Sequence, residues 1–271
     1  GGSDVYLAKY NSCGQIDWVQ TWGAASNDEG MSVIVDSANG VYVCGIYKEM
    51  VDFDPGSGTV YRTASGVYDV FLSKFDSTGA FQWVGTWGGI LRETAEEVDV
   101  DGSNNVYVTG WFEDTVDFDP SGSSTSRTSA GGPDAYISKF NSSGGFQWVR
   151  TWGASGGDNS YGLDVTSTGD VYSTGQFLGT VDFDPGGGTD THTSTGTWLP
   201  DAFITKFDTS GNHQWAHAWG SDDFENGIDV TVYNNTEVYC GGWFQGVCDF
   251  DPSGGTSNRT SNGAADIFIS K

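Results

Sequence analysis

The sequence is poor in basic residues. Only 11 of its 271 residues are Lys or Arg, against 36 Asp and Glu, which gives a formal net charge of −25. Such a charge repels the phosphates of nucleic acid and the headgroups of an anionic membrane, so neither is an expected partner. It favours cations, basic partners or simple solubility.

Long apolar runs are also missing. No stretch approaches the roughly 20 apolar residues of a membrane span, and the chain starts Gly-Gly-Ser without a signal peptide. We therefore expect a mature or excised part of a longer precursor. The four cysteines, Cys13, Cys44, Cys240 and Cys248, have no CxxC spacing, which argues against a zinc site and leaves three alternative disulfide pairings open.

No recognisable catalytic set is present. His192, His213 and His217 do not recur along the chain, and two histidines on one strand without a clear third ligand are a weak zinc signal. Carboxylates are numerous enough for a glycosidase pair. However, several near-equivalent units would each display that pair, whereas active sites generally need one asymmetric pocket. We expect no enzymatic activity.

Glycine and aromatic residues are abundant, with 41 Gly, 16 Phe, 12 Tyr and 11 Trp, as in a β-protein. They recur within a repeat that starts at residues 4, 69, 134 and 201, with a fifth partial start at 266, so its length is about 65 residues. Each start reads Asp-x-aromatic-apolar-small-Lys. In the first four copies a turn, a Trp-x-x-x-Trp-Gly strand, a short strand, a Val-Tyr strand and Asp-Phe-Asp-Pro follow.

The repeat's strands are apolar on both faces. In residues 69–75, Phe71 and Phe75 lie on one face, and Val70 and Leu72 lie on the other. A two-sheet sandwich normally leaves one face wet, whereas a propeller blade is covered by a neighbour on each side. The pattern predicts an all-β chain, residues 1–271 forming one β-propeller domain of four blades. The Trp pairs then serve blade-to-blade packing.

The strand order resembles the bacterial SBBP-type β-propeller repeat. The matching residues are Lys-Phe-Asp-Ser-Thr-Gly at 74–79, Val-Asp-Val-Asp at 98–101 and Asn-Val-Tyr-Val-Thr-Gly at 105–110. An inserted hairpin carrying Asp-Phe-Asp-Pro departs from the family pattern. The resemblance covers nearly the whole chain and implies a secreted or cell-surface scaffold. It implies no particular reaction.

The phase of the repeat makes a prediction about closure. We name the short strand around Val33 A, the Val-Tyr strand B, the Asp…Lys strand C and the Trp strand D. The chain opens with C and D and ends with A, B and a fifth C. If the ring closes, the first C and D complete the last blade, and residues 266–271 are a surplus strand. That strand either marks an excerpt of a longer array or pairs with another subunit and builds a polymer.

The Asp-Phe-Asp-Pro turns are candidates for Ca²⁺ sites. Phe anchors such a turn in the core, while two carboxylates and Gly-rich carbonyls supply the oxygen ligands that Ca²⁺ prefers. The alternative is that one Asp caps the turn and the other pairs with a Lys or Arg. The predicted ligands are Asp52, Asp54, Asp117, Asp119, Asp182, Asp184, Asp249 and Asp251.

A second acidic set lies on strand A. Asp99, Asp164 and Asp229 would converge near the axis if strand A lines a central channel, with Ile34 at the equivalent position of the first copy. Close like charges need a cation, water or raised pKa values. The alternative is that they cap the backbone of the adjacent blade. Acidic residues just before strand A are interpreted as solvated loops: Asp28 and Glu29, Glu96 and Glu97, and Asp222 and Asp223.

The expected function is a non-catalytic structural or adhesive module of a bacterial surface protein that assembles with itself or with other surface components. Three Asn-x-Ser/Thr sequons agree with an extracellular setting. The alternative is a lectin-like binder of glycans or proteins that uses Trp111, Trp198 and Trp243, which lie outside the Trp pairs.

Overall fold

The computed structural model describes all 271 residues and contains strands but no helix. Three successive four-stranded antiparallel sheets have the order A-B-C-D that the repeat predicts. The first blade consists of β3 (Glu29–Val35), β4 (Val41–Tyr47), β7 (Asp69–Phe75) and β8 (Phe81–Trp87). The second consists of β9 (Glu93–Val100), β10 (Val106–Phe112), β13 (Asp134–Phe140) and β14 (Phe146–Trp152). The third consists of β15 (Asn159–Val165), β16 (Val171–Phe177), β19 (Asp201–Phe207) and β20 (His213–Trp219).

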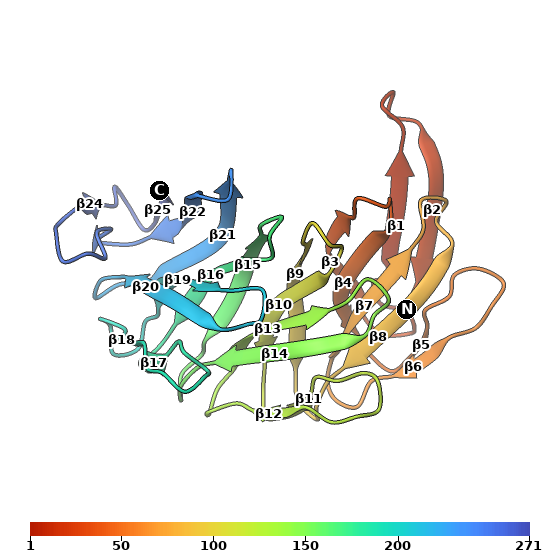
Figure 1. Cartoon of the computed structure of the whole chain (residues 1–271). Helices are drawn as coiled ribbons and strands as arrows, with labels where there is room; N and C mark the ends of the chain where they lie inside the picture. The colour runs from red at the N-terminus through yellow and green to blue at the C-terminus, as the bar shows by residue number, and fades with distance from the viewer.

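Incomplete sheets lie at the two ends of this row (Figure 1). The N-terminal hairpin pairs β1 (Val5–Tyr10) with β2 (Ile16–Trp22), which are strands C and D of the repeat. The last sheet contains β21 (Glu225–Tyr233), β22 (Glu237–Phe244) and β25 (Asp266–Ser270), which are strands A, B and C. The A strands of neighbouring blades lie side by side from β3 through β9 and β15 to β21.

A small accessory hairpin joins strands B and C in each unit. Its first strand ends at the Asp-Phe-Asp-Pro turn, and its second strand carries the Arg-Thr or His-Thr pair. The four hairpins are β5 (Met50–Asp52) with β6 (Tyr61–Thr63), β11 (Thr115–Asp117) with β12 (Ser126–Thr128), β17 (Thr180–Asp182) with β18 (Thr191–Thr193), and β23 (Val247–Asp249) with β24 (Asn258–Thr260).

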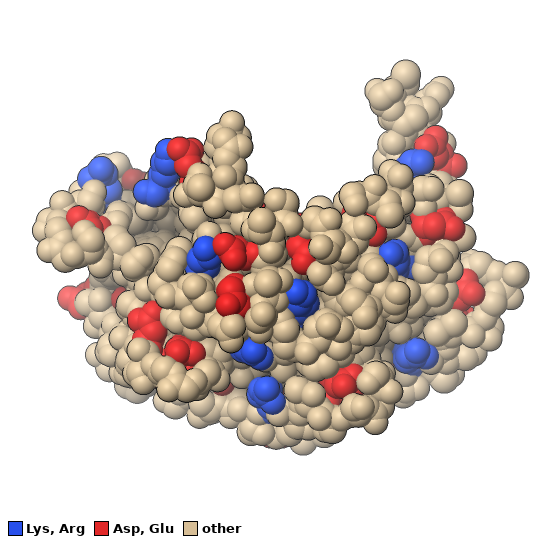
Figure 2. Space-filling model, in the orientation of Figure 1, with Lys and Arg blue, Asp and Glu red and all other residues tan.

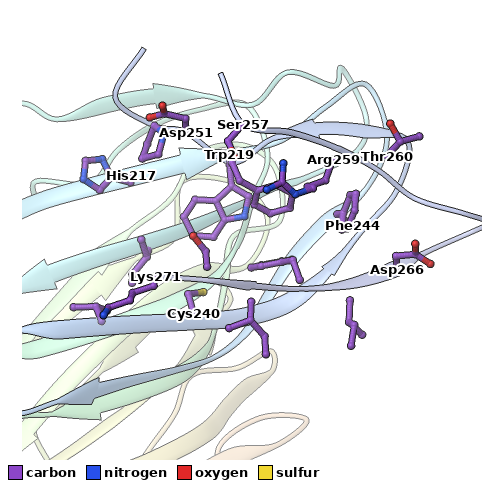
Figure 3. Close-up of a pocket in the computed structure, with 18 of the residues that line it drawn as sticks. His217, Trp219, Cys240, Phe244, Asp251, Ser257, Arg259, Thr260, Asp266 and Lys271 are labelled. Carbon is purple, nitrogen blue, oxygen red and sulfur yellow. The ribbon is translucent and has the colours of Figure 1, made fainter. Parts of the chain in front are cut away.

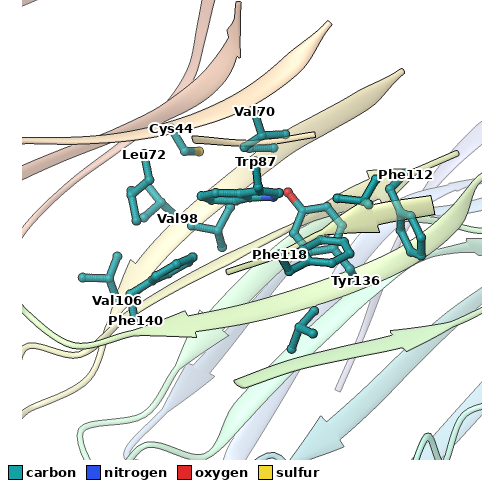
Figure 4. Close-up of a cluster of buried hydrophobic side chains, with 14 of the residues drawn as sticks. Cys44, Val70, Leu72, Trp87, Val98, Val106, Phe112, Phe118, Tyr136 and Phe140 are labelled. Atoms are coloured by element: carbon teal, nitrogen blue, oxygen red, sulfur yellow. The ribbon is translucent and has the colours of Figure 1, made fainter. Parts of the chain in front are cut away.

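The hydrophobic core lies between blades. Figure 4 shows Val70 and Leu72 of the first blade beside Tyr136 and Phe140 of the second, with Trp87 between them. The Trp87 and Phe140 rings are stacked with centroids 5.2 Å apart. Both faces of strand C are therefore covered, as the two apolar faces predict, and the second Trp of the pair packs between blades.

The predicted closure is not observed. β1 pairs with β2 alone, and β25 pairs with β22 in the strand C position of the last blade. In Figure 1 these two ends lie at opposite sides of an arc of sheets. Strands β1 and β2 thus do not complete the last blade here, and β25 is not surplus to it. All four cysteines are free thiols, so none of the three disulfide pairings is formed.

Candidate functional site

The Asp-Phe-Asp-Pro turns are organised by their own backbone. The Asp117 carboxylate accepts hydrogen bonds from the backbone N–H groups of Asp119, at 3.2 Å, and Thr125, at 2.8 Å. Asp119 accepts one from Ser121 at 2.9 Å, and Phe118 is fully buried. The same contacts recur for Asp52 with Asp54, Asp182 with Asp184, and Asp249 with Asp251.

This geometry favours turn capping over metal binding. In each turn a carboxylate oxygen is already occupied by backbone N–H donors, which satisfies groups that would otherwise lack partners. No three His, Cys, Asp or Glu side chains are grouped so that they could hold a metal ion. The Ca²⁺ sites stay a prediction, and the capping alternative accounts for the observed contacts.

Carboxylates of strand A join neighbouring blades. Asp99 accepts a hydrogen bond from the backbone N–H of Val165 at 2.6 Å, and Asp164 accepts one from Val232 at 2.8 Å. Glu96 and Glu97, interpreted above as a solvated loop, lie within β9, so that interpretation was wrong. Glu97 accepts the N–H of Leu163 at 2.6 Å. The strand A acids therefore cap the backbone of the adjacent blade.

Asp229 occupies a different register from Asp99 and Asp164. Asp99 and Asp164 lie opposite Tyr107 and Tyr172 of strand B, and the residue opposite the corresponding Tyr239 is Thr231. The third repeat is two residues longer than the others, so a 65-residue step places strand A of the last blade two residues too early. The predicted equivalence of Asp229 was wrong.

The acidic groups around strand A nevertheless influence one another. Burial, aided by the nearby charges of Asp229, Asp99 and Asp164, raises the pKa of Glu97 to about 7, although its hydrogen bond to Leu163 opposes this shift. Burial likewise raises the pKa of Asp99 to about 6, although its hydrogen bonds to Val165 and Val100 oppose this shift. Convergence of Asp99, Asp164 and Asp229 on a central channel stays a prediction.

A buried carboxylate lies at or just before the start of each strand A. The interpretation of Asp28 as part of a solvated loop was wrong, and the other three carboxylates were not predicted. Asp28, Glu93, Asp158 and Glu225 are all buried, and each accepts a backbone N–H from the loop that follows the preceding Trp-Gly. Burial raises the pKa of Glu93 to about 8 and that of Asp158 to about 7. In the sequence, an acidic residue recurs at this position of every unit, and that recurrence could have predicted the buried carboxylate. The change between Asp and Glu from unit to unit hid the recurrence.

A repeated contact fastens strands C and D to the next blade. The amine of the strand C lysine donates to a carbonyl in the next C–D turn: Lys9 to Ser77 at 3.4 Å, Lys74 to Ser142 at 3.1 Å and Lys139 to Thr209 at 2.9 Å. The turn glycine lies against the first Trp of the preceding blade. A Cβ placed on Gly79, Gly144 or Gly211 would lie 2.8–3.0 Å from that ring.

His213 and His217 lie on one strand, β20, as the sequence suggested, and His192 on β18 lies in the same unit. The Nε2 atoms of His192 and His213 lie 3.2 and 3.5 Å from the two oxygens of Asp190. The ring of His217 stacks on Trp215 at a centroid distance of 5.0 Å. Burial lowers the pKa of His217, and the charge of His192 adds to this.

The three unpaired tryptophans do not form one surface. Trp198 is exposed in a loop, Trp243 stacks on Phe224 at 4.7 Å, and Trp111 lies half-buried on β10. None of them lines the three cavities at the ends of the row, which have volumes of about 820, 800 and 360 Å³. The lectin-like site stays a prediction.

Apolar side chains are uncovered at both ends of the row. Tyr6 is 72% exposed and Ile267 is 84% exposed, whereas Phe71 and Val70, at the same repeat positions in the first blade, are fully buried. We call Tyr6, Tyr10, Val33 and Val35 the N-terminal face, and Ile267 and Ile269 the C-terminal face. Every residue of the two faces is more than half exposed.

Charges are scattered over the surface seen in Figure 2, with acidic side chains in the majority. The chain contains no helix long and apolar enough to cross a membrane. The two features that distinguish the structure are the apolar end faces and the hydrogen bonds that recur between neighbouring blades.

Comparisons with known proteins agree with a repeat architecture. An uncharacterized WD repeat-containing protein of Acanthamoeba polyphaga mimivirus is 24% identical over 258 residues, 84% of this chain and 19% of that protein. The regulatory protein FlaEY of Caulobacter vibrioides is 30% identical over 151 residues, 54% of this chain and 15% of that protein. The chain therefore spans less than a fifth of the length of either relative.

No protein-family profile matches the chain, so membership of the SBBP-type family stays a prediction. WD repeats form β-propeller blades of four strands, and the sheets described above have the same four-stranded, repeated form. The chain is a β-propeller-like repeat protein.

Proposed function

We propose that this chain is a non-catalytic protein-interaction module that binds partner proteins through its N-terminal and C-terminal faces. The observation that carries the proposal is the contrast between the end faces and the interior. Side chains at the same repeat positions are buried by a neighbouring blade inside the row and exposed at its ends.

The chemistry of the two faces suits a protein partner. Aromatic and branched apolar side chains on a rigid sheet are the groups that dominate protein interfaces. The two relatives, a WD repeat-containing protein and a regulatory protein, support the same class of function.

The acidic residues support a structural role over a catalytic one. Asp99, Asp117 and Glu93 each accept a hydrogen bond from a backbone N–H group. The Asp117 and Glu93 contacts recur from unit to unit. A secreted or cell-surface setting and an adhesive role remain part of the proposal, and they rest on the resemblance to the surface repeats and on the sequons.

Site-specific photo-crosslinking tests the proposal. A photoreactive amino acid replaces Tyr6 or Ile267 in the protein made by its natural host, and Tyr61 serves as the matched control because it is 55% exposed away from both faces. We expect discrete protein adducts, identified by mass spectrometry, from positions 6 and 267 and none from position 61. Equal yields at all three positions would rule out the end faces as binding surfaces.

A further inference from the structure

Two buried carboxylates meet in the seam between the second and third blades. Asp134 begins β13 of the second blade, and Asp158 stands directly before β15 of the third; Asp134 is 5% exposed and Asp158 is fully buried. A Cβ on Gly153 would lie 2.4 Å from Oδ1 of Asp134, and Oδ2 of Asp158 accepts the N–H of Ala154 at 2.7 Å. The two carboxylates therefore converge on one dipeptide of the loop between β14 and β15.

The seam between the first and second blades contains the same pair. Asp69 begins β7 of the first blade and Glu93 begins β9 of the second, and both are buried. A Cβ on Gly88 would lie 2.6 Å from Oδ1 of Asp69, and one on Gly89 would lie 3.3 Å from Oε1 of Glu93. Both seams join complete four-stranded blades, so neither pair borders an end of the row.

Three of the four carboxylate oxygens in the Asp134–Asp158 pair accept backbone hydrogen bonds. Oδ2 of Asp134 accepts the N–H of Ala130 at 3.0 Å. Asp158 accepts the N–H groups of Ala154 and Leu178, at 2.7 and 2.9 Å, one on each oxygen. The fourth oxygen, Oδ1 of Asp134, is buried and has no partner.

The Asp69–Glu93 pair repeats this pattern with the roles of the two residues exchanged. Asp69 accepts the N–H groups of Ser65 and Gly66, at 2.9 and 3.2 Å, one on each oxygen. Oε2 of Glu93 accepts the N–H of Gly89 at 3.0 Å, and Oε1 of Glu93 is buried without a partner. Each pair thus contains one empty acceptor next to a second carboxylate.

A buried oxygen without a partner and two buried charges side by side are both costly. None of the four carboxylates forms an ion pair with a basic side chain. None lines the cavities at the ends of the row, of which Figure 3 shows the one at the C-terminal end. A proton on the empty oxygen removes both costs, because it cancels one charge and gives the O–H a carboxylate to donate to.

The charges around the pairs favour this proton. Burial raises the pKa values of Asp134 and Asp158, the charge of Asp134 raises that of Asp158 further, and no other charged side chain acts on either. Burial also raises the pKa values of Asp69 and Glu93. The other titratable groups that face this second pair are Glu113, Asp114, Tyr47 and Tyr136. All of these groups are acidic side chains or phenols, so none of them stabilises a second negative charge.

We propose that each pair, Asp134 with Asp158 and Asp69 with Glu93, shares one proton and acts as a pH-sensitive clasp between successive blades. In the closed clasp the O–H donates to the other carboxylate, and the three remaining oxygens keep their backbone donors. Loss of the proton leaves two charges facing each other across the seam. The contribution of the clasp to stability is complete below the unfolded pKa values and is lost as pH rises through the folded ones.

Amide substitutions in the Asp134–Asp158 pair test the position of the proton. Asp134→Asn places an NH₂ group at the empty oxygen, where it donates to Asp158, and its own oxygen still accepts from Ala130. We expect this variant to match the unmodified chain at pH 5 and to be more stable at pH 8. In Asp158→Asn an NH₂ group would face the N–H of Ala154 or Leu178. We therefore expect lower stability at both pH values.

The Asp69–Glu93 pair predicts the opposite order along the chain, since its empty oxygen belongs to the second residue. Glu93→Gln should keep the clasp closed at pH 8, and Asp69→Asn should lower stability at both pH values. Urea denaturation at pH 5 and pH 8 measures all four variants. Asp119→Asn, which removes a charge outside both pairs, is the control and should leave the pH dependence unchanged. Equal effects of the two amide substitutions within each pair would refute the clasp.

Amide hydrogen exchange reads the clasp in the unmodified chain. After correction for the intrinsic rates, the opening constants of the amides of Ala130, Ala154 and Leu178 should rise about tenfold per pH unit between about pH 5 and pH 7. The amide of Thr125, which donates to Asp117 in an Asp-Phe-Asp-Pro turn, is the control and should show no such rise. Opening constants that do not change with pH would overturn the proposal. Protection of the three amides by Ca²⁺ at pH 8 would also overturn it, because the empty oxygen would then take a cation.

Discussion

At the residue scale, the chain uses its acidic side chains as backbone acceptors. Asp28, Glu93, Asp158 and Glu225 are buried in the same place of successive units, and their raised pKa values follow mainly from burial. A buried carboxylate that is charged costs free energy, which its hydrogen bonds only partly offset. These residues therefore link the stability of the fold to pH.

Glu93 allows a direct test of this link. Its pKa is raised from 4.5 to about 8 in the folded chain, so the fold is favoured while Glu93 is protonated. This contribution is complete below the unfolded pKa and is lost as pH rises through the folded pKa. We expect the free energy of unfolding to fall between about pH 5 and pH 8, and Glu93→Gln to reduce that fall by about 1–2 kcal/mol.

Urea denaturation at several pH values measures the effect. Gln at position 93 cannot ionise, and it keeps the acceptor for the N–H of Gly89, which lies 3.0 Å from Glu93. Glu113→Gln, which removes a charge near Glu93, is a control and should change the slope much less. An unchanged pH dependence in the Glu93 variant would contradict the assignment of the raised pKa.

At the element scale, the seam between blades is the unit that repeats. Lys139 is 8% exposed; it donates to the carbonyl and hydroxyl of Thr209, and its amine lies 4.9 Å from the Tyr107 ring centroid. Lys9 occupies the same repeat position in the N-terminal hairpin, where its side chain is 47% exposed and its contact with the Ser77 carbonyl is longer, at 3.4 Å. The same substitution should therefore have unequal effects at the two sites.

Lys139→Met keeps the apolar stem and removes the charge-assisted hydrogen bonds. We expect a loss of about 2 kcal/mol in the free energy of unfolding at Lys139 and less than about 1 kcal/mol for Lys9→Met. Guanidinium denaturation followed by Trp fluorescence gives both values. Equal losses of free energy at the two positions would show that the contacts of Lys139 between blades do not add to the stability of the fold.

Substitutions in the Asp-Phe-Asp-Pro turn and a chelator together distinguish backbone capping from calcium binding. Asp117 accepts two backbone N–H groups and Asp119 accepts one. We expect Asp117→Ala to lower the free energy of unfolding by about 1–3 kcal/mol, and Asp119→Ala by less. A chelator should leave the thermal midpoint of the unmodified chain unchanged. A lower midpoint in the chelator would favour the calcium prediction instead.

At the scale of the whole molecule, the sequence predicts the blade better than the arrangement of blades. Alternation within residues 69–75 predicts a strand covered on both faces, and the strand order A to D follows from the order of the repeat. These features depend on local patterns. Closure depends on the rotation between successive blades, which packing across each seam determines and which no single residue pattern reveals.

The misassignment of Asp229 has a similar origin. The extra two residues of the third repeat lie outside strand A, so comparison of residue types alone aligned Asp229 with Asp99. Only the pairing of Thr231 with Tyr239 reveals the true register. Likewise, the gathering of His192 and His213 at Asp190 depends on contacts between β18 and β20 that follow from folding.

Hydroxyl-radical footprinting of the dilute chain tests most directly whether the two end faces are uncovered blade seams. We expect strong oxidation of Tyr6 and Ile267 and little oxidation of Phe71 and Val70, which occupy the same repeat positions inside the row. Addition of a partner that binds the faces should protect Tyr6 and Ile267. If Tyr6 and Ile267 are as protected as Phe71 and Val70 in the dilute chain, the end faces are already covered and cannot be free binding surfaces.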